Sequence, residues 1–331
     1  MLRQDFPLKD LNTFGIECTA RYYFELTDVR DPAELQDTIR RHRTLVLGGG
    51  SNILFRNSRF DGLVLHNKLK GINVVEEDKN SIIVEVKAGE VWDDFVAYCV
   101  ENKYYGVENL SLIPGTAGAA PVQNIGAYGV ELKDVFYQLN AIHLSTGEQK
   151  TFDKNSCRFG YRDSVFKSHY PDTYLITAVQ LKLSKQKKLN LSYPGLQEYK
   201  DEITDIRQVR NAVIKIRKEK LPDPEITGNA GSFFKNPVIS REKLNQLISK
   251  YPDIPHYPFG DRWKVAAGWL IEKAGWKGKR TGNAGVHDKQ ALILVNYGGS
   301  TGEEILNLAA QIEKDVYRLS GIRLEREVRV Y

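Results

Sequence analysis

The sequence predicts a mixed α/β protein built from two or three domains. A chain of 331 residues is longer than one ordinary domain. Residues 44–47 (TLVL) are typical of a short buried strand, after a helix expected to start with Asp31 as N-cap and Pro32 at its first position. Residues 225–320 alternate helix and strand patterns. They follow a Leu-Pro-Asp-Pro stop at 221–224, which indicates a domain boundary.

The middle of the chain and its tail carry further patterns. A strand is expected over 82–86, and a helix from about 91 to 102. A glycine- and alanine-rich segment at 114–129 precedes more strands, and residues 206–220 predict an amphipathic helix. Residues 322–331 alternate between apolar and charged side chains and predict a strand.

Composition and charge exclude some function classes. Lys and Arg number 47 against 42 Asp and Glu, a net charge of +5 that fits anionic small molecules and nucleic acids alike. No basic run is interleaved with aromatic residues, so nucleic-acid binding is not expected. Three widely spaced cysteines favour a reducing compartment and argue against disulfides or a metal site. No apolar run approaches the roughly 18 residues of a membrane span, so we expect a soluble, cytoplasmic protein.

A first glycine-rich loop follows the strand at 44–47. Its residues are Gly48, Gly49, Gly50, Ser51 and Asn52, whose successive backbone N–H groups can form a nest for a diphosphate. The loop has neither the dinucleotide fingerprint nor the Gly-Lys-Ser/Thr of a Walker loop. Taken alone, such a loop is more often a tight connection than a phosphate site.

The segment 114–129, PGTAGAAPVQNIGAYG, is the stronger signal. Its small residues allow the backbone to approach a large flat ligand and to donate N–H groups to it. The alternative is an irregular surface loop, but such a loop usually carries more charge. Two separate glycine-rich segments therefore suggest a cofactor larger than a mononucleotide.

Three polar residues lie in otherwise apolar surroundings. They are Arg162 in CRFGYRDSVFK (157–167), Ser232 in GNAGSFFKNP (228–237) and Glu327 in LEREVR (324–329). A lone residue of this kind is more often structural than catalytic. Ser232 has no Gly-x-Ser-x-Gly elbow and no histidine nearby in sequence, which argues against serine-hydrolase chemistry.

At these segments the chain resembles the UDP-N-acetylenolpyruvoylglucosamine reductases, flavoproteins of bacterial cell-wall precursor synthesis. The stretch SYPGL at 192–196 also matches the tyrosine-bearing loop of the longer form of that family. The matching segments occur in the family's order along the whole chain: NTFG (12–15), GGGSN (48–52), IPGTAGAAPVQNIGAYGVE (113–131), CRFGYRDSVFK, KLPDP (220–224), GNAGSFFKNP, AGWLIE (267–272) and LEREVR.

The resemblance implies an α+β, FAD-binding fold of the vanillyl-alcohol oxidase type with a separate α/β substrate domain. The implied parts are a first FAD-binding subdomain at 1–66 joined by the strand 321–331, a second at 67–217, and a substrate domain at 218–320. It also implies FAD and NADPH as cofactor and co-substrate, and UDP-N-acetylglucosamine enolpyruvate as the substrate. No histidine or cysteine occurs in 48–52 or 114–129, so non-covalent FAD is expected, with no protein partner required.

The resemblance also assigns residues. The catalytic residues implied are Arg162 and Glu327, which stabilise developing charge, and Ser232 as proton donor. Tyr193 is the implied loop tyrosine. Lys235 can equally be a surface charge beside two phenylalanines. The cofactor contacts implied are Gly48, Gly49, Gly50, Ser51, Asn52, Pro114, Gly115, Thr116, Gly118, Ala119, Val122, Gly126 and Arg329. The substrate contacts are Tyr193, Arg217, Lys220, Lys235, Asn236 and, more weakly, Gln290.

Two other readings stay open at this point. One is a different oxidase of the same flavin fold, although those enzymes often link the flavin covalently through His or Cys. The other is a non-catalytic nucleotide-binding protein, against which the joint presence of Arg162, Ser232 and Glu327 argues.

Overall fold

The computed structural model describes all residues, 1–331, and the chain divides into two compact units. The first unit comprises residues 1–6, 20–50 and 61–219. The second comprises residues 7–19, 51–60 and 220–331. Each unit is therefore discontinuous in sequence. The finer three-part division expected from the sequence stays a prediction.

The first unit begins with a four-stranded sheet in the order β1-β2-β5-β3. The strand predicted at 44–47 is present as β3 (Thr44–Leu47), and it pairs in parallel with β5 (Arg59–Asn67). The other strands and the nearby short helices are β1 (Arg3–Pro7), β2 (Thr19–Leu26), α1 (Asp31–Glu34) and α2 (Gln36–Arg41). Asp31 does not cap a helix as expected. Its carboxylate accepts the N–H groups of Thr27 and Asp28 in the preceding turn, at 2.9 Å each.

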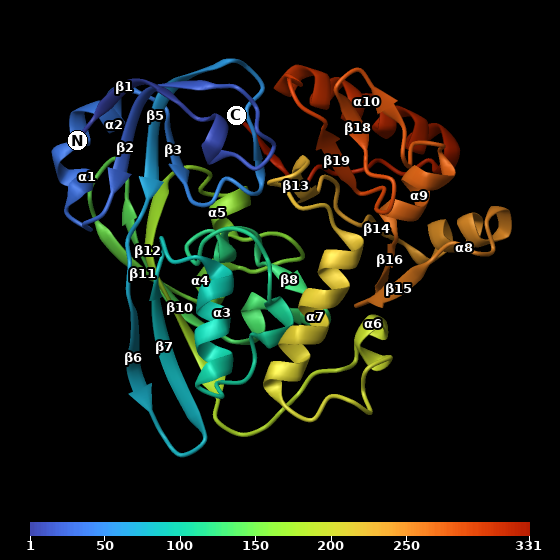
Figure 1. Cartoon of the computed structure of the whole chain (residues 1–331), viewed down its shortest axis with the longest axis horizontal. Coiled ribbons are helices and arrows are strands. Elements are labelled where there is room, and N and C mark those ends of the chain that lie inside the picture. Colours follow the sequence, from blue (N-terminus) through green and yellow to red (C-terminus); the bar gives the residue numbers. More distant parts are fainter. The chain divides into compact units, whose positions relative to one another are not determined.

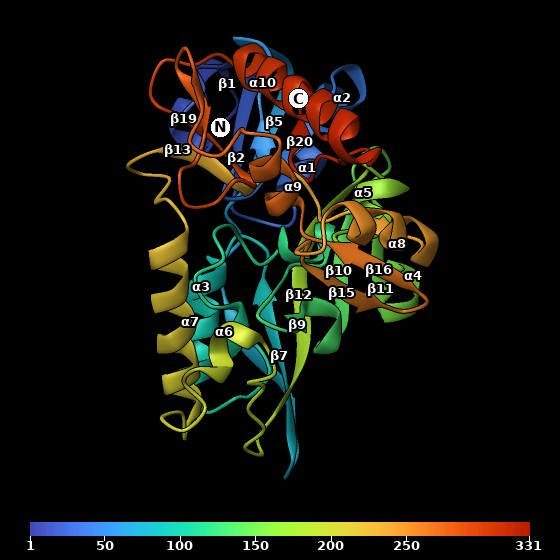
Figure 2. The ribbon, with the colours of Figure 1, turned by 90° about the vertical axis from the view of Figure 1, so that its right-hand side faces the viewer.

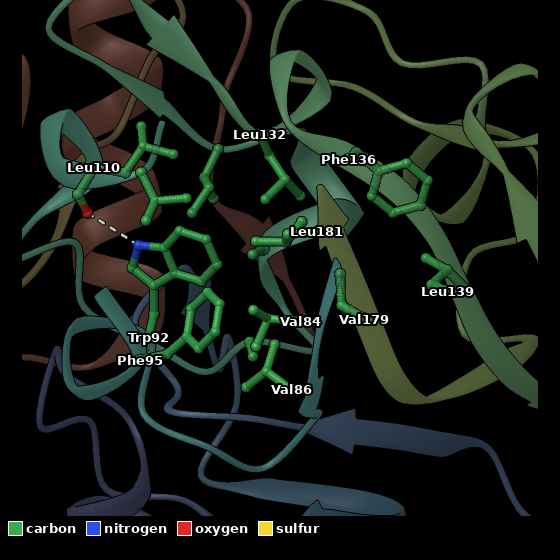
Figure 3. Packing of buried hydrophobic residues seen from close by; sticks show 14 of the residues in the cluster. Val84, Val86, Trp92, Phe95, Leu110, Leu132, Phe136, Leu139, Val179 and Leu181 are labelled. Atoms are coloured by element: carbon green, nitrogen blue, oxygen red, sulfur yellow. Dashed lines mark hydrogen bonds between the residues drawn. The ribbon is translucent and has the colours of Figure 1, made fainter. Parts of the chain in front are cut away.

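A five-stranded antiparallel sheet forms the main core of the first unit. The strand predicted at 82–86 is β7, and the helix predicted near 91–102 is α3 (Trp92–Glu101). Trp92 and Phe95 of α3 lie against Val84 and Val86 of β7 (Figure 3). The indole N–H of buried Trp92 donates to the carbonyl of Leu110 at 2.9 Å, so its polar atom is satisfied. The strands in sheet order are β11 (Gln149–Asp153), β10 (Phe136–His143), β12 (Tyr174–Ser184), β7 (Ser81–Lys87) and β6 (Ile72–Glu77).

The helix predicted at 206–220 is α7 (Ile206–Lys220), which lies beside α3 in both views (Figures 1 and 2). Arg210 of α7 forms two hydrogen bonds of 2.6 and 2.8 Å with the carboxylate of Asp93 on α3. The apolar side of α7 packs with Leu196 of α6 (Pro194–Gln197). Short elements complete this unit: α4 (Lys154–Cys157), α5 (Val165–Ser168), three 3₁₀ turns (Glu108–Leu110, Ala120–Gln123, Leu132–Asp134), β8 (Gly126–Ala127) and β9 (Val130–Glu131).

The second unit alternates short strands and helices, as its sequence predicts. Its long helix α10 (Gly302–Ser320) starts at a capping box, in which Thr301 and Glu304 satisfy each other's backbone N–H groups, and ends at Gly321 with φ +67°. One sheet has the order β13 (Gly228–Ser232), β19 (Ile293–Asn296), β18 (Ala284–Val286) and β17 (Arg280–Thr281). Another has the order β14 (Val238–Ile239), β16 (Arg262–Val265) and β15 (His256–Phe259). The remaining helices are α8 (Arg241–Lys250), α9 (Ala267–Lys273) and a 3₁₀ turn at Lys9–Leu11.

The tail is less regular than the predicted strand over 322–331. Only Arg329–Val330 form a strand, β20, which pairs in parallel with β4 (Ile53–Leu54). A few residues earlier, Arg326 bridges to Phe234 instead. The tail changes partner within four residues, and one continuous ladder cannot form.

None of the helices has both the length and the apolar character that crossing a bilayer requires.

Candidate functional site

The two glycine-rich segments lie against each other in the first unit. A Cβ atom at Gly48 would sit 2.5 Å from Thr116 Oγ1, and one at Gly49 would sit 2.9 Å from Gly115 Cα. The neighbour of Gly49 is main chain and cannot move aside, so glycine is required there, whereas a side chain at Gly48 would force the Thr116 hydroxyl to rotate away. The sequence predicts each segment as a ligand loop separately, and the structure brings them together.

Gly48 is also supported from behind by His66 of β5. His66 lies opposite Leu47 in the parallel β3–β5 pair, and its ring hydrogen-bonds to the main chain of Gly48. Its Nδ1 is 2.7 Å from the hydroxyl of Tyr23 on β2. Burial, with a contribution from Lys68, lowers the pKa of His66 to about 4, so the ring is neutral near pH 7.

The start of the second glycine segment is fixed to the junction of β7 and α3. Ala117 and Gly118 donate their N–H groups to the carbonyls of Glu90 and Ala88, both at 2.9 Å. A Cβ at Gly118 would sit 2.5 Å from Ala88 Cβ. Gly118 is therefore needed for internal packing, and these two N–H groups do not face a ligand. The N–H groups that the sequence predicts for a ligand must therefore come from other residues of the segment.

The end of that segment is the β8–β9 hairpin, against which Arg162 packs. Arg162 Nη2 donates to the carbonyl of Gly126 at 2.5 Å. A Cβ at Gly126 would lie 2.9 Å from Arg162 Nη1, so glycine makes room for the guanidinium. Arg162 has φ +54°, a backbone conformation that few non-glycine residues adopt and that often marks functional positions. The predicted catalytic arginine therefore lies on the predicted flavin segment.

A second arginine and two tyrosines gather at the same hairpin. Arg217 of α7 hydrogen-bonds to Tyr128, and the Tyr128 and Tyr193 rings meet edge to face at 5.0 Å. Arg217 Nε is buried and has no hydrogen-bond partner within the protein. Burial lowers the pKa of Arg217, and the nearby charge of Arg162 adds to this effect. Two cations and an unused donor at one place favour an anionic ligand.

In the second unit, Ser232 and Glu327 come from two segments that run side by side. Ser232 ends β13 and pairs with Ile293. The N–H of Glu327 donates to the carbonyl of Phe233 at 2.8 Å, and Phe234 bridges to Arg326. Glu327 is only 9% exposed. The structure therefore brings these two predicted catalytic residues close together, on two segments that are paired through backbone hydrogen bonds.

Lys235 continues this ladder and is not a surface charge. It is 9% exposed, and its Nζ forms an ion pair with the carboxylate of Glu325. Its N–H also donates to the Glu325 carbonyl at 2.8 Å. The alternative of a surface lysine is therefore wrong for this residue. The phosphate contact stays a prediction, and a phosphate there would compete with Glu325 for the Lys235 ammonium group.

The other predicted ligand residues of the second unit occupy three places. Asn236 and Gln290 lie near the start of α9: Asn236 Oδ1 accepts the Ala267 N–H at 2.9 Å, and Gln290 Oε1 lies 3.0 Å from a Cβ built at Gly268. The backbone N–H of Arg329 donates to the Asn52 carbonyl at 3.1 Å. Arg329 thus flanks the last residue of the first glycine loop. Lys220, at the end of α7, is exposed.

The sequence reasoning missed the residues that hold these segments from outside. Asp93 accepts the N–H of Leu112 at 2.5 Å in addition to its bonds with Arg210. Leu112 has φ +58° and lies two residues before the start of the second glycine segment. Asp93, Arg210 and His66 carry no local sequence signal, because their partners are 18 or more residues away. Tyr128 had one: it precedes a glycine between apolar residues, which is typical of a hairpin turn.

No group of three or more His, Cys, Asp or Glu side chains in residues 1–331 has the arrangement of a metal site.

Comparison with known proteins identifies both halves of the chain. Residues 22–153 match a model described as an FAD binding domain. Residues 223–331 match the model of the UDP-N-acetylenolpyruvoylglucosamine reductase C-terminal domain.

Curated proteins and a solved structure resemble the whole chain. The UDP-N-acetylenolpyruvoylglucosamine reductase of Flavobacterium johnsoniae is 46% identical over 99% of both chains. That of Pseudomonas aeruginosa is 47% identical over 100% of this chain and 99% of its own. The crystal structure of UDP-N-acetylenolpyruvylglucosamine reductase from Thermus caldophilus matches with a TM-score of 0.69 and 23% identity, covering 100% of this chain and 98% of that one. At that identity the structural match supports the fold alone.

Proposed function

Because this chain belongs to the UDP-N-acetylenolpyruvoylglucosamine reductase family, we propose a course for its reaction and a role for each site residue. The chain is an FAD-dependent oxidoreductase that reduces UDP-N-acetylglucosamine enolpyruvate during peptidoglycan precursor synthesis. Its α+β, FAD-binding fold is the one expected from the sequence. The observation that carries this conclusion is the agreement of both family models and the curated relatives over nearly the full length.

The two glycine-rich segments, 48–52 and 114–129, are the proposed binding site for the pyrophosphate and flavin of FAD. Gly49 allows the backbones of the two segments to pack together, so their main chains can face one ligand side by side. We assign the predicted contacts at 48–52 to the pyrophosphate, and those at 114–126 to the flavin and its linker. Arg329, beside Asn52, is assigned to the isoalloxazine side.

Bound FAD supplies a hydride, taken from NADPH, to the β-carbon of the enolpyruvyl double bond. Negative charge then develops at the α-carbon next to the carboxylate. In the proposal, Arg162 stabilises this charge, since its guanidinium is already fixed on Gly126. Ser232 donates the proton that completes the reduction. Glu327 orients a donor or supplies a proton of its own.

The UDP diphosphate requires cations and polar donors. Arg217 is the strongest candidate, because its buried Nε has no protein partner. Tyr193, Lys220, Lys235, Asn236 and Gln290 complete the proposed set. NADPH also carries a diphosphate, so we propose that both substrates use the same cations in turn. Initial-rate plots are then parallel, whereas intersecting lines would show a ternary complex.

Anaerobic half-reactions test the proposal directly. The purified protein is expected to be yellow, to bleach with NADPH, and to recover its colour when UDP-N-acetylglucosamine enolpyruvate is added without oxygen. Recovery with oxygen alone would favour an oxidase of the same fold.

A cytoplasmic location belongs to the same proposal. Cys18, Cys99 and Cys157 are all free and buried, which suits a reducing compartment. Cell fractionation with activity measurements tests it.

A further inference from the structure

The β8–β9 hairpin has an unusual turn. Gly126 pairs with Glu131 and Ala127 with Val130, which leaves Tyr128 and Gly129 as a two-residue turn. Their φ angles are +50° and +81°, so both central residues are left-handed, as a type I′ turn requires. The first of these positions is normally Asn, Asp or Gly, and a tyrosine there is strained. The surroundings must therefore stabilise this turn.

Two asparagines hold the turn through its two carbonyl groups. Asn109, which is 1% exposed, donates both amide hydrogens: to the Tyr128 carbonyl at 2.8 Å and to the Asn190 carbonyl at 2.9 Å. Asn190 Nδ2 donates to the Gly129 carbonyl at 3.2 Å. The turn at 128–129 is thereby tied to a chain segment about 60 residues further on.

Asn190 also fixes the start of the tyrosine loop. Its Oδ1 accepts the Ser192 N–H at 3.1 Å and the Ser192 hydroxyl at 2.7 Å. The next residue is Tyr193, whose ring meets the Tyr128 ring edge to face at 5.0 Å. Beyond it, Leu196 is fully buried against α7. Tyr193 is thus held by the chain on both sides of it and by the Tyr128 ring, while 40% of it stays exposed to solvent.

We propose that Asn109 and Asn190 are positioning residues for Tyr193, and that through Tyr193 they set the affinity for the UDP-sugar. This inference rests on the proposed function of Tyr193 as a substrate contact. A tyrosine fixed in the unliganded enzyme loses less conformational entropy when the substrate binds than a tyrosine on a free loop. The asparagines keep Tyr193 on the hairpin of the cofactor segment, so the substrate contact and the cofactor segment share one support.

The Asn190→Ala holoenzyme is the primary test. It loses the bonds to Gly129 and Ser192, and the hairpin is expected to persist because the Asn109 bonds to the Tyr128 and Asn190 carbonyls remain. The dissociation constant of the UDP-sugar, measured by its perturbation of the flavin spectrum, is expected to rise about tenfold, the usual effect of one or two lost hydrogen bonds. Hydrogen exchange of the amides at 190–197 is expected to accelerate in the absence of substrate. Bleaching by saturating NADPH is expected to be unchanged.

Asn80→Ala is the matched control. Asn80 Oδ1 accepts the Gln186 side chain at 2.6 Å, so it anchors the same long connection at its other end, away from Tyr193. This variant is expected to bind the UDP-sugar like the wild type. Equal weakening in both variants would mean that general loosening of the connection explains the effect, and would overturn the proposal.

A double-mutant cycle separates positioning from simple destabilisation. In a Tyr193→Ala background, adding Asn190→Ala is expected to cause no further loss of affinity, because its effect acts through Tyr193. Additive losses would overturn the proposal. Asn109→Ala is measured in the same cycle with flavin content as the check on folding, and Asn190 alone decides the outcome if that variant does not fold.

The test also distinguishes this inference from the proposed function. If the wild type is not reoxidised by the UDP-sugar, the proposed function fails, whatever the exchange data show. If the wild type turns over and the Asn190→Ala enzyme matches it in affinity and exchange, the positioning inference fails alone.

Discussion

The candidate sites of the two units are built in opposite ways. In the first unit, glycines and main-chain bonds dominate. Gly48 packs on the Thr116 side chain, Gly49 packs on the Gly115 backbone, and the N–H groups of Ala117 and Gly118 are bonded at the β7–α3 junction. In the second unit, side chains dominate, since Ser232, Lys235 and Glu327 project from two paired segments. A site made of backbone depends on shape and tolerates no added atoms. In a site made of side chains, a substitution can abolish the chemistry while the fold is kept, because the backbone hydrogen bonds between the two segments remain.

The largest expected effect is in the second unit, where chemistry alone should change. Ser232→Ala is expected to slow reoxidation by the enolpyruvyl substrate by roughly 10²–10⁴-fold, the usual size of a general-acid contribution. Bleaching by NADPH should stay near the normal rate, because the proton is needed only after hydride transfer. Stopped-flow traces of flavin absorbance in each direction measure both steps.

Ser232→Cys is the matched variant, since a thiol donates a proton from nearly the same position, and partial recovery is expected. A folded, yellow alanine enzyme with two normal half-reactions would show that Ser232 only ends a strand.

The next effect concerns the support of Gly48. His66 has a folded pKa of about 4 against an ordinary 6.5, so the unfolded chain binds its proton more readily. The free energy of unfolding therefore has its full value above pH 6.5 and falls by at most about 3 kcal/mol as the pH drops from 6.5 toward 4. FAD affinity should weaken over the same range, because a charge on the buried His66 ring destabilises the packing that supports the Gly48 loop.

Denaturant titrations and flavin release between pH 7 and 4 measure this dependence. His66→Gln keeps a donor and an acceptor but cannot titrate, so its profile should be flatter. Identical profiles in both proteins would assign the acid sensitivity to other groups.

In the first unit, adding one methyl group at Gly49 should reduce FAD binding without changing the chemical steps. Gly49→Ala places a carbon 2.9 Å from Gly115 Cα, and overpacking of this kind typically costs about 1–3 kcal/mol. We expect purified protein with reduced flavin content and normal half-reactions once FAD is saturating. The ratio of flavin to protein absorbance reports the loss.

Gly160→Ala is the control, since its Cβ would make an ordinary contact of 3.5 Å with Asp163 Cβ. Equal flavin retention in the two alanine variants would contradict a steric requirement at Gly49.

The smallest effect is expected at the support between α3 and α7. Burial raises the pKa of Asp93, but hydrogen bonds from Arg210 and from the Leu112 N–H outweigh it, so the pKa lies below its ordinary value. Asp93→Asn is expected to lower the free energy of unfolding by about 1–2 kcal/mol at pH 7, because charge-assisted bonds become neutral ones.

Because the pKa of Asp93 is lowered, its contribution is present above the unfolded value of 3.8 and disappears as the pH falls through the lower folded value. The difference between Asp93→Asn and wild type, from urea titrations, should therefore shrink below pH 4. A constant difference would assign the effect to packing.

Much of the fold could be predicted because it follows local patterns. The helices α3 and α7 and the strands β3 and β7 lie within a few residues of their predicted bounds. Asp31 shows the limit, since its carboxylate satisfies an earlier turn instead of a helix end. The tail also shows it, because a period of two cannot reveal that the partner changes from Phe234 to Ile53.

The candidate site divides along the same line. Gly48, Arg162 and Ser232 could be predicted because each lies in a short motif of neighbouring residues that is typical of a tight loop or of the family. Asn109 and Asn190 are 81 residues apart, and an asparagine that donates to carbonyls leaves no pattern in either neighbourhood. Such supports follow from tertiary contacts alone.

The discontinuity of the second unit has a consequence for synthesis on the ribosome. Its early segments, 7–19 and 51–60, belong with residues 220–331. The Phe14 carbonyl accepts the Asn296 amide at 2.8 Å, and Gly302 packs directly on the Phe55 carbonyl. These early segments emerge long before their partners and carry side chains such as Phe14 and Phe55, which are 1% exposed once folded. A nascent chain paused between residues 60 and 220 therefore displays apolar surface that only later synthesis can cover, which makes this stage the one most in need of chaperones.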